Sequence, residues 1–259
     1  MRFALGVEYD GSPFSGWQRQ AHAASVQAAV ERALSKIADH PVQATCAGRT
    51  DAGVHATQQV VHFDTSAVRP ARAWLMGGNA NLPESVGFTW LREVDDSFNA
   101  RFSATARAYR YVICSRPLRP ALHRKRVSWT YKALDAERMH EAGQALLGEH
   151  DFTSFRAVAC QAKHPIRTIE RLSVRRSGDY LYLDIAANAF LHHMVRNIAG
   201  TLMTVGAGEQ PVGWVREVLE ARDRTVAGIT APAEGLYLVA VRYPSVYDLP
   251  EQGELPVFA

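Results

Sequence analysis

Apolar residues along this chain recur either with the two-residue period of strands or with the three-to-four-residue period of helices. Ser25 is a good N-cap, and the apolar positions that follow it repeat at helical spacing until Asp39-His40-Pro41 ends the pattern. The elements predicted in this first part of the chain are a strand within 1–10, this helix, strands at 42–46 and 59–63, a short helix from Pro70 to Gly77-Gly78, and a strand at 86–90.

The rest of the chain continues this mixed order. The predicted elements are a strand at 105–114, a helix at 135–147, strands at 166–175 and 180–187, a helix at 190–205, a helix from Pro211 to Leu219, and a strand at 236–243. Because strands and helices do not alternate strictly, we expect an α+β protein with antiparallel or mixed sheets that carry helices on one face. We place two domains at 1–104 and 105–259, and the Pro-rich tail at 244–259 is either a strap or disordered.

Composition limits the class of protein. With 259 residues, of which 47% are hydrophobic, the chain has enough apolar surface for one large domain or two of ordinary size. It has no run of 18 apolar residues, and its first ten residues turn acidic too soon for a signal peptide, so we expect a cytosolic protein without a membrane span. Cys46, Cys114 and Cys160 form no C-x-x-C pair, and we interpret them as buried or half-buried thiols.

The distribution of charge is more informative than the net charge of +3. Residues 97–134 and 152–169 contain no Asp or Glu, and aromatic residues lie among the basic residues of the longer stretch. Those basic residues are Arg101, Arg107, Arg110, Arg116, Arg119, Arg124, Lys125, Arg126 and Lys132. Solvated surface is the common explanation for a basic run, but two long acid-free stretches in a chain with 26 acidic residues favour a surface that faces phosphates.

Metal and cofactor motifs are not found in the sequence. His192 and His193 are adjacent on the predicted helix at 190–205, where neighbouring side chains point about 100° apart. No carboxylate stands at ligand spacing beside them, so we expect no metal. The chain has neither a P-loop nor a dinucleotide fingerprint, and we therefore expect no cofactor.

The most polar candidate site is the glycine-flanked loop Gly48-Arg49-Thr50-Asp51-Ala52-Gly53-Val54-His55-Ala56, which lies between two predicted strands. An Asp between glycines is commonly a turn residue and nothing more. Here Arg49 is two residues away and His55 is four, so a cation close to the carboxylate is expected to favour its ionised form and to lower its pKa. An ionised carboxylate in a cleft acts as a nucleophile or a base.

The loop GRTDAGVHA strongly resembles the catalytic loop of the tRNA pseudouridine synthase A family. The other motifs of that family have counterparts here in the same order. Any one of these motifs alone would be weak evidence, whereas all of them in order make a chance match very improbable. They are Tyr9-Asp10-Gly11 with Gly16-Trp17-Gln18, Asn99–Ala104 with Tyr109-Arg110-Tyr111, Asp151–Arg156, Asn188–Asn197 and Glu234–Leu238. The resemblance covers nearly the whole chain and is weakest from Pro244 onward.

The resemblance implies two similar α+β domains with a cleft between them, a homodimer, and a cofactor-free reaction. The implied reaction is isomerisation of uridine to pseudouridine in the anticodon stem-loop of tRNA, at tRNA positions 38, 39 and 40, after the target base is flipped out of the stem. The attack falls either on the sugar C1′ or on C6 of the base. Two alternatives stay open, namely a related synthase acting on other RNA uridines and an RNA-binding or tRNA-folding module with catalysis secondary.

The resemblance also assigns roles to residues. Asp51 is the expected nucleophile, Arg196 its ion-pair partner, Tyr109 a ring over the target uracil, and Leu236 the apolar wall of the uracil pocket. Without the resemblance, Arg196 is explained by solvent exposure, since it projects roughly 140° from the apolar stripe of its predicted helix, while Tyr109 and Leu236 are explained by packing. The expected tRNA contacts are Arg49, Arg69, Phe98, Asn99, Ala100, Arg101, Phe102, Ala159, Cys160, Gln161, Ala162 and Lys163.

Overall fold

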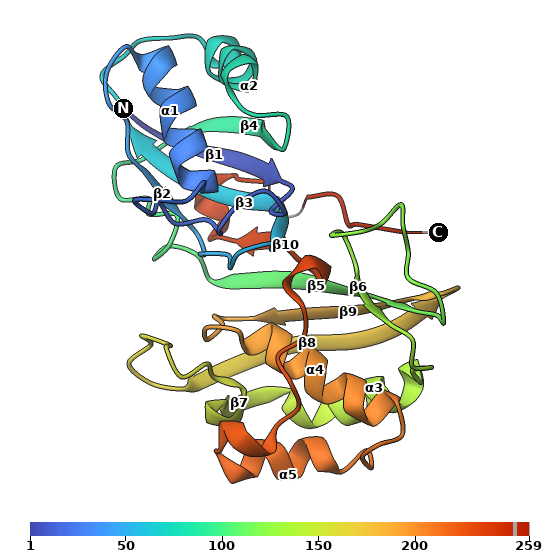
Figure 1. The fold of residues 1–259 in the computed structure, drawn as a ribbon. Helices are drawn as coiled ribbons and strands as arrows, with labels where there is room; N and C mark the ends of the chain where they lie inside the picture. Colours follow the sequence, from blue (N-terminus) through green and yellow to red (C-terminus); the bar gives the residue numbers. More distant parts are fainter. Residues whose placement is uncertain (251–252, 259) are drawn as a thin grey trace. The chain divides into compact units, whose positions relative to one another are not determined.

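The computed structural model describes residues 1–250 and 253–258 and divides into two compact units (Figure 1). The first unit comprises Met1–Thr105 and Tyr237–Leu255, and the second comprises Ala106–Leu236 and Pro256–Ala259. The chain thus leaves the first unit next to the expected domain boundary. The assignment of 105–259 to one domain differs from this division, because the last strand returns to the first unit.

The first unit contains a mixed sheet with the strand order β4-β1-β3-β10. Its strands are β1 (Arg2–Tyr9), β3 (His55–Asp64), β4 (Val86–Val94) and β10 (Leu236–Arg242), and the short β2 (Ala44–Cys46) also pairs with β3. β1 is antiparallel to β3 and to β4, whereas β10 runs parallel to β3 at Tyr237 and Leu238. β3 is therefore an inner strand, and its first two residues, His55 and Ala56, are the last two of the loop 48–56 that carries Asp51 (the Asp51 loop).

The helices of the first unit are α1 (Val26–Ala38), a π-helical turn η1 (Ala73–Gly77) and α2 (Gly78–Asn81). Ser25 caps α1, as predicted, by accepting a hydrogen bond from the N–H of Ala28 at 3.3 Å. The prediction that Gly77-Gly78 end the second helix is wrong, because helical structure continues to Asn81. Both glycines instead allow close packing, since a Cβ at Gly78 would lie 2.5 Å from the Phe88 ring.

The second unit contains a sheet with the strand order β5-β9-β8-β7. Its strands are β5 (Ala106–Ser115), β9 (Tyr180–Ala187), β8 (Ile166–Ser177) and β7 (Gly148–Asp151), all antiparallel to their neighbours, and β6 (Ser128–Thr130) runs parallel to β5. β6 and β7 were not predicted, because three or four residues are too few to show a period. The α+β class with mixed sheets is confirmed in each unit.

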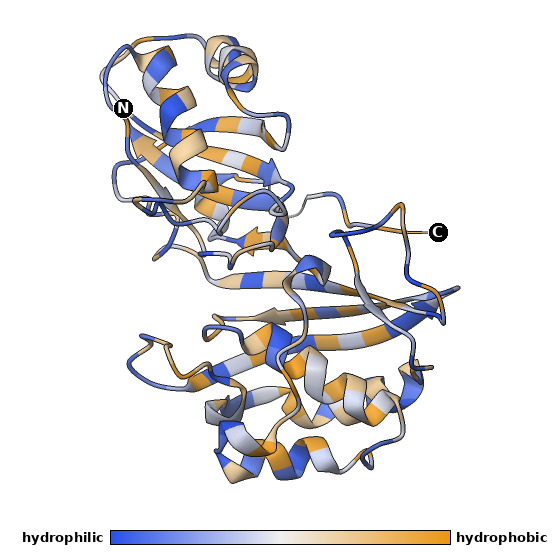
Figure 2. Cartoon of the chain, in the orientation of Figure 1, coloured by the Kyte–Doolittle hydropathy of each residue, from blue (hydrophilic) through white to orange (hydrophobic). Residues whose placement is uncertain are grey.

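Helices α3 (Ala136–Gly143), α4 (Met194–Gly206) and α5 (Trp214–Ala221) belong to the second unit. α3 packs against β8 and α4, and α5 packs against α3 and α4. The short turns of this unit are η2 (Gln144–Leu146), η3 (Thr153–Phe155), η4 (Arg224–Val226) and η5 (Ala233–Gly235), whereas η6 (Ser245–Tyr247) belongs to the first unit. Figure 2 shows hydrophobic and hydrophilic segments alternating along the strands and helices of both units.

Helix α4 begins at Met194, four residues later than predicted. Its N-cap His193 has a left-handed backbone (φ 62°), so residues 190–193 form an irregular approach to the helix. Apolar side chains such as Leu191 continue the apolar pattern upstream without being helical, and periodicity alone does not reveal that difference.

The C-terminal tail is held by hydrogen bonds at several points. Gln58 donates to the carbonyl of Pro250 at 2.9 Å, and the N–H of Gly253 donates to Val239 at 3.0 Å. The Tyr182 hydroxyl donates to the carbonyl of Phe258 at 2.7 Å and accepts from the N–H of the same residue at 2.8 Å. Of the two alternatives for the tail, its described part resembles a strap; residues 251, 252 and 259 lie outside the described residues.

Across the part of the chain that the structure describes, no helix combines the length and the apolar character that crossing a bilayer requires.

Candidate active site

Asp51 lies in the irregular segment between β2 and β3, and its side chain is half-buried. The carbonyl of Asp51 accepts a hydrogen bond from the N–H of Val54 at 3.1 Å, which closes a tight turn. Gly53 has a φ of 78° in this turn, a left-handed conformation that favours glycine. The turn that the glycines predicted is therefore present and is closed by the backbone.

The segment that contains the Tyr9-Asp10-Gly11 motif packs directly on the Asp51 loop. Trp17 donates its N–H to the carbonyl of Thr50 at 3.0 Å, and Gly11 donates its N–H to Nδ1 of His55 at 3.1 Å. Only glycine fits at the closest point, because a Cβ at Gly11 would lie 1.9 Å from the carbonyl oxygen of Val54. The first motif thus holds the loop that carries Asp51.

His55, which was expected to help place a cation near Asp51, contacts the first motif and β10. The residue is the first of β3 and is buried, and its ring stacks on Tyr237 with 4.6 Å between centroids. Nδ1 lies 3.2 Å from Oδ1 of Asp10 and accepts from the N–H of Gly11. This nitrogen is therefore engaged by the first motif. Arg49, in contrast, is exposed and available to a ligand of the loop.

The expected RNA-contact residues 98–102 form a compact turn with a buried and an exposed part. Phe98 and Ala100 are fully buried, while Arg101 and Phe102 are exposed, Phe102 to 78%. Asn99 accepts hydrogen bonds from the N–H groups of Arg101 and Phe102 at 3.0 and 3.1 Å. The guanidinium of Arg101 lies over the Phe102 ring at 5.3 Å. Side-chain contacts with RNA from this turn are therefore available to Asn99, Arg101 and Phe102 but not to Phe98 or Ala100.

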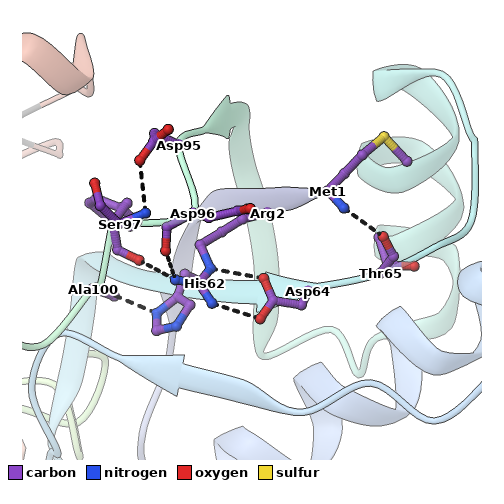
Figure 3. Close-up of polar contacts among 10 residues, drawn as sticks. Met1, Arg2, His62, Asp64, Thr65, Asp95, Asp96, Ser97 and Ala100 are labelled. Atoms are coloured by element: carbon purple, nitrogen blue, oxygen red, sulfur yellow. Dashed lines mark hydrogen bonds and ion pairs between the residues drawn. The ribbon is translucent and has the colours of Figure 1, made fainter.

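A polar cluster under this turn fixes it to the sheet (Figure 3). Arg2 makes two hydrogen bonds of 2.8 Å to the carboxylate of Asp64 and donates to the carbonyls of Phe98, at 2.9 Å, and Asp96. The N–H of Ala100 donates to Nδ1 of His62 at 3.1 Å. Hydrogen bonding to Arg2 lowers the pKa of Asp64, and burial, followed by the charge of Arg2, lowers the pKa of His62. His62 is thus kept neutral as an acceptor.

Arg196 lies in the first turn of α4 and is half-buried. Its Nε donates to the carbonyl of Ala231 at 2.8 Å, and the N–H of Ala231 donates back to the carbonyl of Arg196 at 3.1 Å. The neighbouring Asn197 is fully buried and accepts from Arg224 and Thr230 at 3.1 and 2.7 Å. Solvent exposure therefore does not explain Arg196, since its guanidinium is oriented by the segment before β10.

Tyr109 and Leu236 are both buried, at 9% and 6% exposure. Tyr109 lies on β5, and its ring is perpendicular to that of Phe190 with 5.1 Å between centroids. The roles expected for Tyr109 and Leu236 beside a uracil stay predictions.

The expected contact segment 159–163 is held by Arg156. This arginine donates to the carbonyls of Cys160 and Ala162, each at 2.7 Å, while Gln161 and Lys163 point to solvent. Burial opposes ionisation of the half-buried Cys160, but hydrogen bonds from the N–H groups of Ala162 and His192 and the charge of Arg156 lower the pKa of its thiol. Burial raises the pKa of the thiols of Cys46, to about 12, and of Cys114.

Two sequence arguments need correction. His192 and His193 precede α4 rather than lying on it, and their ring centroids are 3.9 Å apart. The argument that adjacent side chains on a helix point about 100° apart therefore does not apply to these two residues. Arg110 was counted in the phosphate-facing stretch, but it is buried and pairs with both carboxylate oxygens of Asp184 at 2.7 and 2.8 Å. The other basic residues differ in exposure, and those that are exposed are Arg101, Arg119, Arg124, Lys125, Arg126 and Lys132.

Arg69, the remaining expected contact residue, is exposed on the first unit. Its Nε donates to the carbonyl of Ile37 at 3.3 Å. Two buried residues, Tyr9 and Gln59, lie next to the Asp51 loop. The sequence pointed to Tyr9 only as a member of the first motif, and it gave no signal for Gln59.

Comparisons with known proteins agree with one another. The sequence model of a family described as tRNA pseudouridine synthase matches residues 6–103 and 142–244. A protein of Aeromonas hydrophila named tRNA pseudouridine synthase A is 60% identical over 251 residues, which cover 97% of this chain and 93% of the relative. A protein of that name from Tolumonas auensis is 60% identical over 97% of this chain and 96% of its own length. Another, from Pectobacterium atrosepticum, is 57% identical over 100% of this chain and 91% of its own length.

Proposed function

Because the chain belongs to the tRNA pseudouridine synthase family, we propose that it isomerises uridine to pseudouridine in tRNA, at positions 38, 39 and 40 of the anticodon stem-loop. The observation that carries the proposal is the Asp51 loop. Its sequence GRTDAGVHA matches the family's catalytic loop without a gap, and the first motif holds it through hydrogen bonds to Thr50 and His55. A half-buried carboxylate on a backbone fixed in this way suits a nucleophile, which must meet one atom of a bound nucleotide.

The proposed reaction moves the base without any outside reagent. The target nucleotide is flipped out of its stem, which costs a few kcal/mol, and the exposed Arg49 fills or props open the space that it leaves. In one course, a carboxylate oxygen of Asp51 bonds to C1′ as the N1–C1′ bond breaks, the uracil rotates, and C5 displaces the carboxylate. C5 then loses its proton and N1 gains one, so atoms and electrons balance. In the other course, Asp51 adds first to C6 and leaves last.

No cofactor or metal enters this scheme, because substrate and product are isomers. We propose that Tyr109 stacks on the uracil and that Leu236 contacts it, as in the family. The pairing of Arg196 with Asp51, which the family resemblance implies, stays a prediction.

The proposed tRNA surface comprises the exposed basic and aromatic residues. Arg101 and Phe102 on their anchored turn offer a cation and a ring face, the combination that binds phosphate and stacks on a base. We also propose a homodimer as the active form, because one protomer of 259 residues is small for contacts with both the anticodon arm and the body of tRNA. A monomer by light scattering that modifies tRNA at the full rate would contradict the dimer.

The experiment that tests the function is a map of pseudouridine in unmodified tRNA transcripts after incubation with the purified protein. Pseudouridine restricted to the anticodon stem-loop is the expected result. Pseudouridine at other uridines would instead indicate a related synthase of different specificity. Tight binding of tRNA without any pseudouridine would indicate an RNA-binding or tRNA-folding module and would overturn the proposal.

A further inference from the structure

Gln59 makes an unusual set of hydrogen bonds for a side chain inside a sheet. It lies on β3 and is completely buried. Its Nε2 donates to the carbonyl of Gly48 at 2.7 Å, and its Oε1 accepts from the N–H of the same residue at 3.4 Å. The side-chain amide therefore pairs with Gly48 as a neighbouring strand would, and Gly48 is three residues before Asp51.

Tyr9 extends this network to the residue next to Asp51. Its hydroxyl lies 2.8 Å from Oγ1 of Thr50, and Nε2 of Gln59 donates to the same hydroxyl at 3.4 Å. Either hydroxyl can be the donor in the bond between Tyr9 and Thr50. Tyr9 is 4% exposed and Thr50 7%, so water competes little for these bonds.

Stability alone does not explain why an amide and two hydroxyls are buried here. The free-energy cost of burying polar groups is largely offset by the hydrogen bonds that they make. Apolar residues of similar volume often give a core of equal stability. What a fully bonded polar network adds is a single geometry. Residues 48–54 of the Asp51 loop lie outside the strands and helices, so their path depends on such anchors.

We infer that Gln59 and Tyr9 are positioning residues for Asp51: Gln59 holds the backbone at Gly48 and Tyr9 holds the side chain of Thr50, and together they set the carboxylate against the bound nucleotide. The inference rests on the proposed nucleophilic role of Asp51. It requires that their loss lowers the rate of the chemical step while tRNA binding, which depends on dispersed surface contacts, is kept. A displacement of about 1 Å at a reacting group costs on the order of 100-fold in rate.

The test compares Gln59→Leu with the matched control Gln58→Leu. Gln58 is the adjacent residue of β3, is buried as Gln59 is, and makes two hydrogen bonds where Gln59 makes three: it donates to Pro250 at 2.9 Å and accepts from Trp90 at 3.3 Å. Successive side chains of a strand point to opposite faces, so Gln58 lies away from the Asp51 loop. Single-turnover rates at saturating enzyme, tRNA dissociation constants and melting temperatures are measured for both variants.

Gln59→Leu is expected to lower the single-turnover rate by about 30-fold or more, with the tRNA dissociation constant within about twofold of wild type. Gln58→Leu is expected to lower the melting temperature by about as much as Gln59→Leu does, but to lower the single-turnover rate by less than about twofold. Tyr9→Phe keeps the ring and nearly all of the volume and removes only the hydroxyl, so it serves as the test variant if Gln59→Leu fails to fold. Its single-turnover rate is expected to fall about three- to tenfold. Equal rate losses at Gln58 and Gln59, or a Tyr9→Phe rate equal to wild type, would overturn the inference.

The same assay separates this inference from the proposed function. Asp51→Asn is measured alongside. If Asp51→Asn is inactive while Gln59→Leu and Tyr9→Phe react at the wild-type rate, the function stands and the positioning role is wrong. If Asp51→Asn itself reacts at nearly the wild-type rate, the proposed nucleophile is wrong, whatever the other variants show.

Discussion

Gly11→Ala is the substitution for which the structure gives the most direct estimate of its effect on the Asp51 loop. The added Cβ would lie 1.9 Å from the carbonyl oxygen of Val54 and 2.5 Å from its carbon. Carbon–oxygen contacts rarely fall below about 3.3 Å, so the two segments must separate by roughly 1.4 Å. The obstacle is backbone, which has no alternative rotamer. The separation also stretches the hydrogen bond from Gly11 to His55, now 3.1 Å.

A shift of this size is expected to lower the single-turnover rate about 100-fold, equivalent to ~2.7 kcal/mol of transition-state stabilisation. Overpacking costs about 1–3 kcal/mol of folding stability, and each kcal/mol lowers the melting temperature by about 2–4 °C in a protein of this size. The control is Gly213→Ala, where the added Cβ meets no heavy atom within 4 Å and φ is −64°. Rate and melting temperature of the control should be unchanged or slightly raised. A Gly11→Ala rate within threefold of wild type would refute the link between loop position and activity.

Three further predictions concern the RNA surface, metal and pH. If the Arg119 side chain contacts one phosphate, Arg119→Gln should weaken tRNA binding and reduce the slope of log K against log salt by about 0.7–0.9. An unchanged slope would show that Arg119 does not contact the RNA. Treatment with EDTA should leave the rate within twofold, whereas loss of activity that added zinc restores would make His192 and His193 ligands. The pKa of His62 is lower in the folded protein than in the unfolded chain, so the unfolded chain takes up a proton first as the pH falls. The free energy of unfolding is therefore highest above about pH 6.5 and decreases as the pH falls toward the pKa of His62 in the folded protein. Between pH 7.5 and 5.5 the wild-type melting temperature should therefore fall further than that of His62→Asn, which keeps an acceptor for Ala100; equal falls would contradict the argument.

Local signals in the sequence were enough to predict most elements. Ser25 and the apolar repeat after it predicted α1 almost to the residue, and alternation predicted β1 and β4. The same signals misplaced the start of α4, because apolar residues continue upstream of His193, although the left-handed backbone at His193 separates them from the helix. Periodicity reports which side chains are buried and does not report how the backbone reaches them.

Long-range pairings were beyond sequence reasoning. The return of β10 to β3 depends on hydrogen bonds between segments about 180 residues apart, for which no local pattern exists. The burial of Arg110 likewise depends on Asp184, which the basic stretch does not contain. The Asp51 loop was predicted from its letters, but Gln59 was not, because a polar residue in a strand gives no sign that its amide pairs with the loop. The sequence thus identified a candidate nucleophile, and the fold shows which residues hold the loop that carries it.

The central claim is that the carboxylate of Asp51 is the nucleophile of a tRNA pseudouridine synthase. The most direct measurement is the single-turnover formation of pseudouridine by Asp51→Asn at saturating enzyme, with tRNA affinity measured in the same buffer. The amide keeps the size of the side chain but is a far poorer nucleophile, so no pseudouridine should form while the dissociation constant stays within about twofold of wild type. A rate within about tenfold of wild type, a loss of only ~1.4 kcal/mol, would contradict the claim.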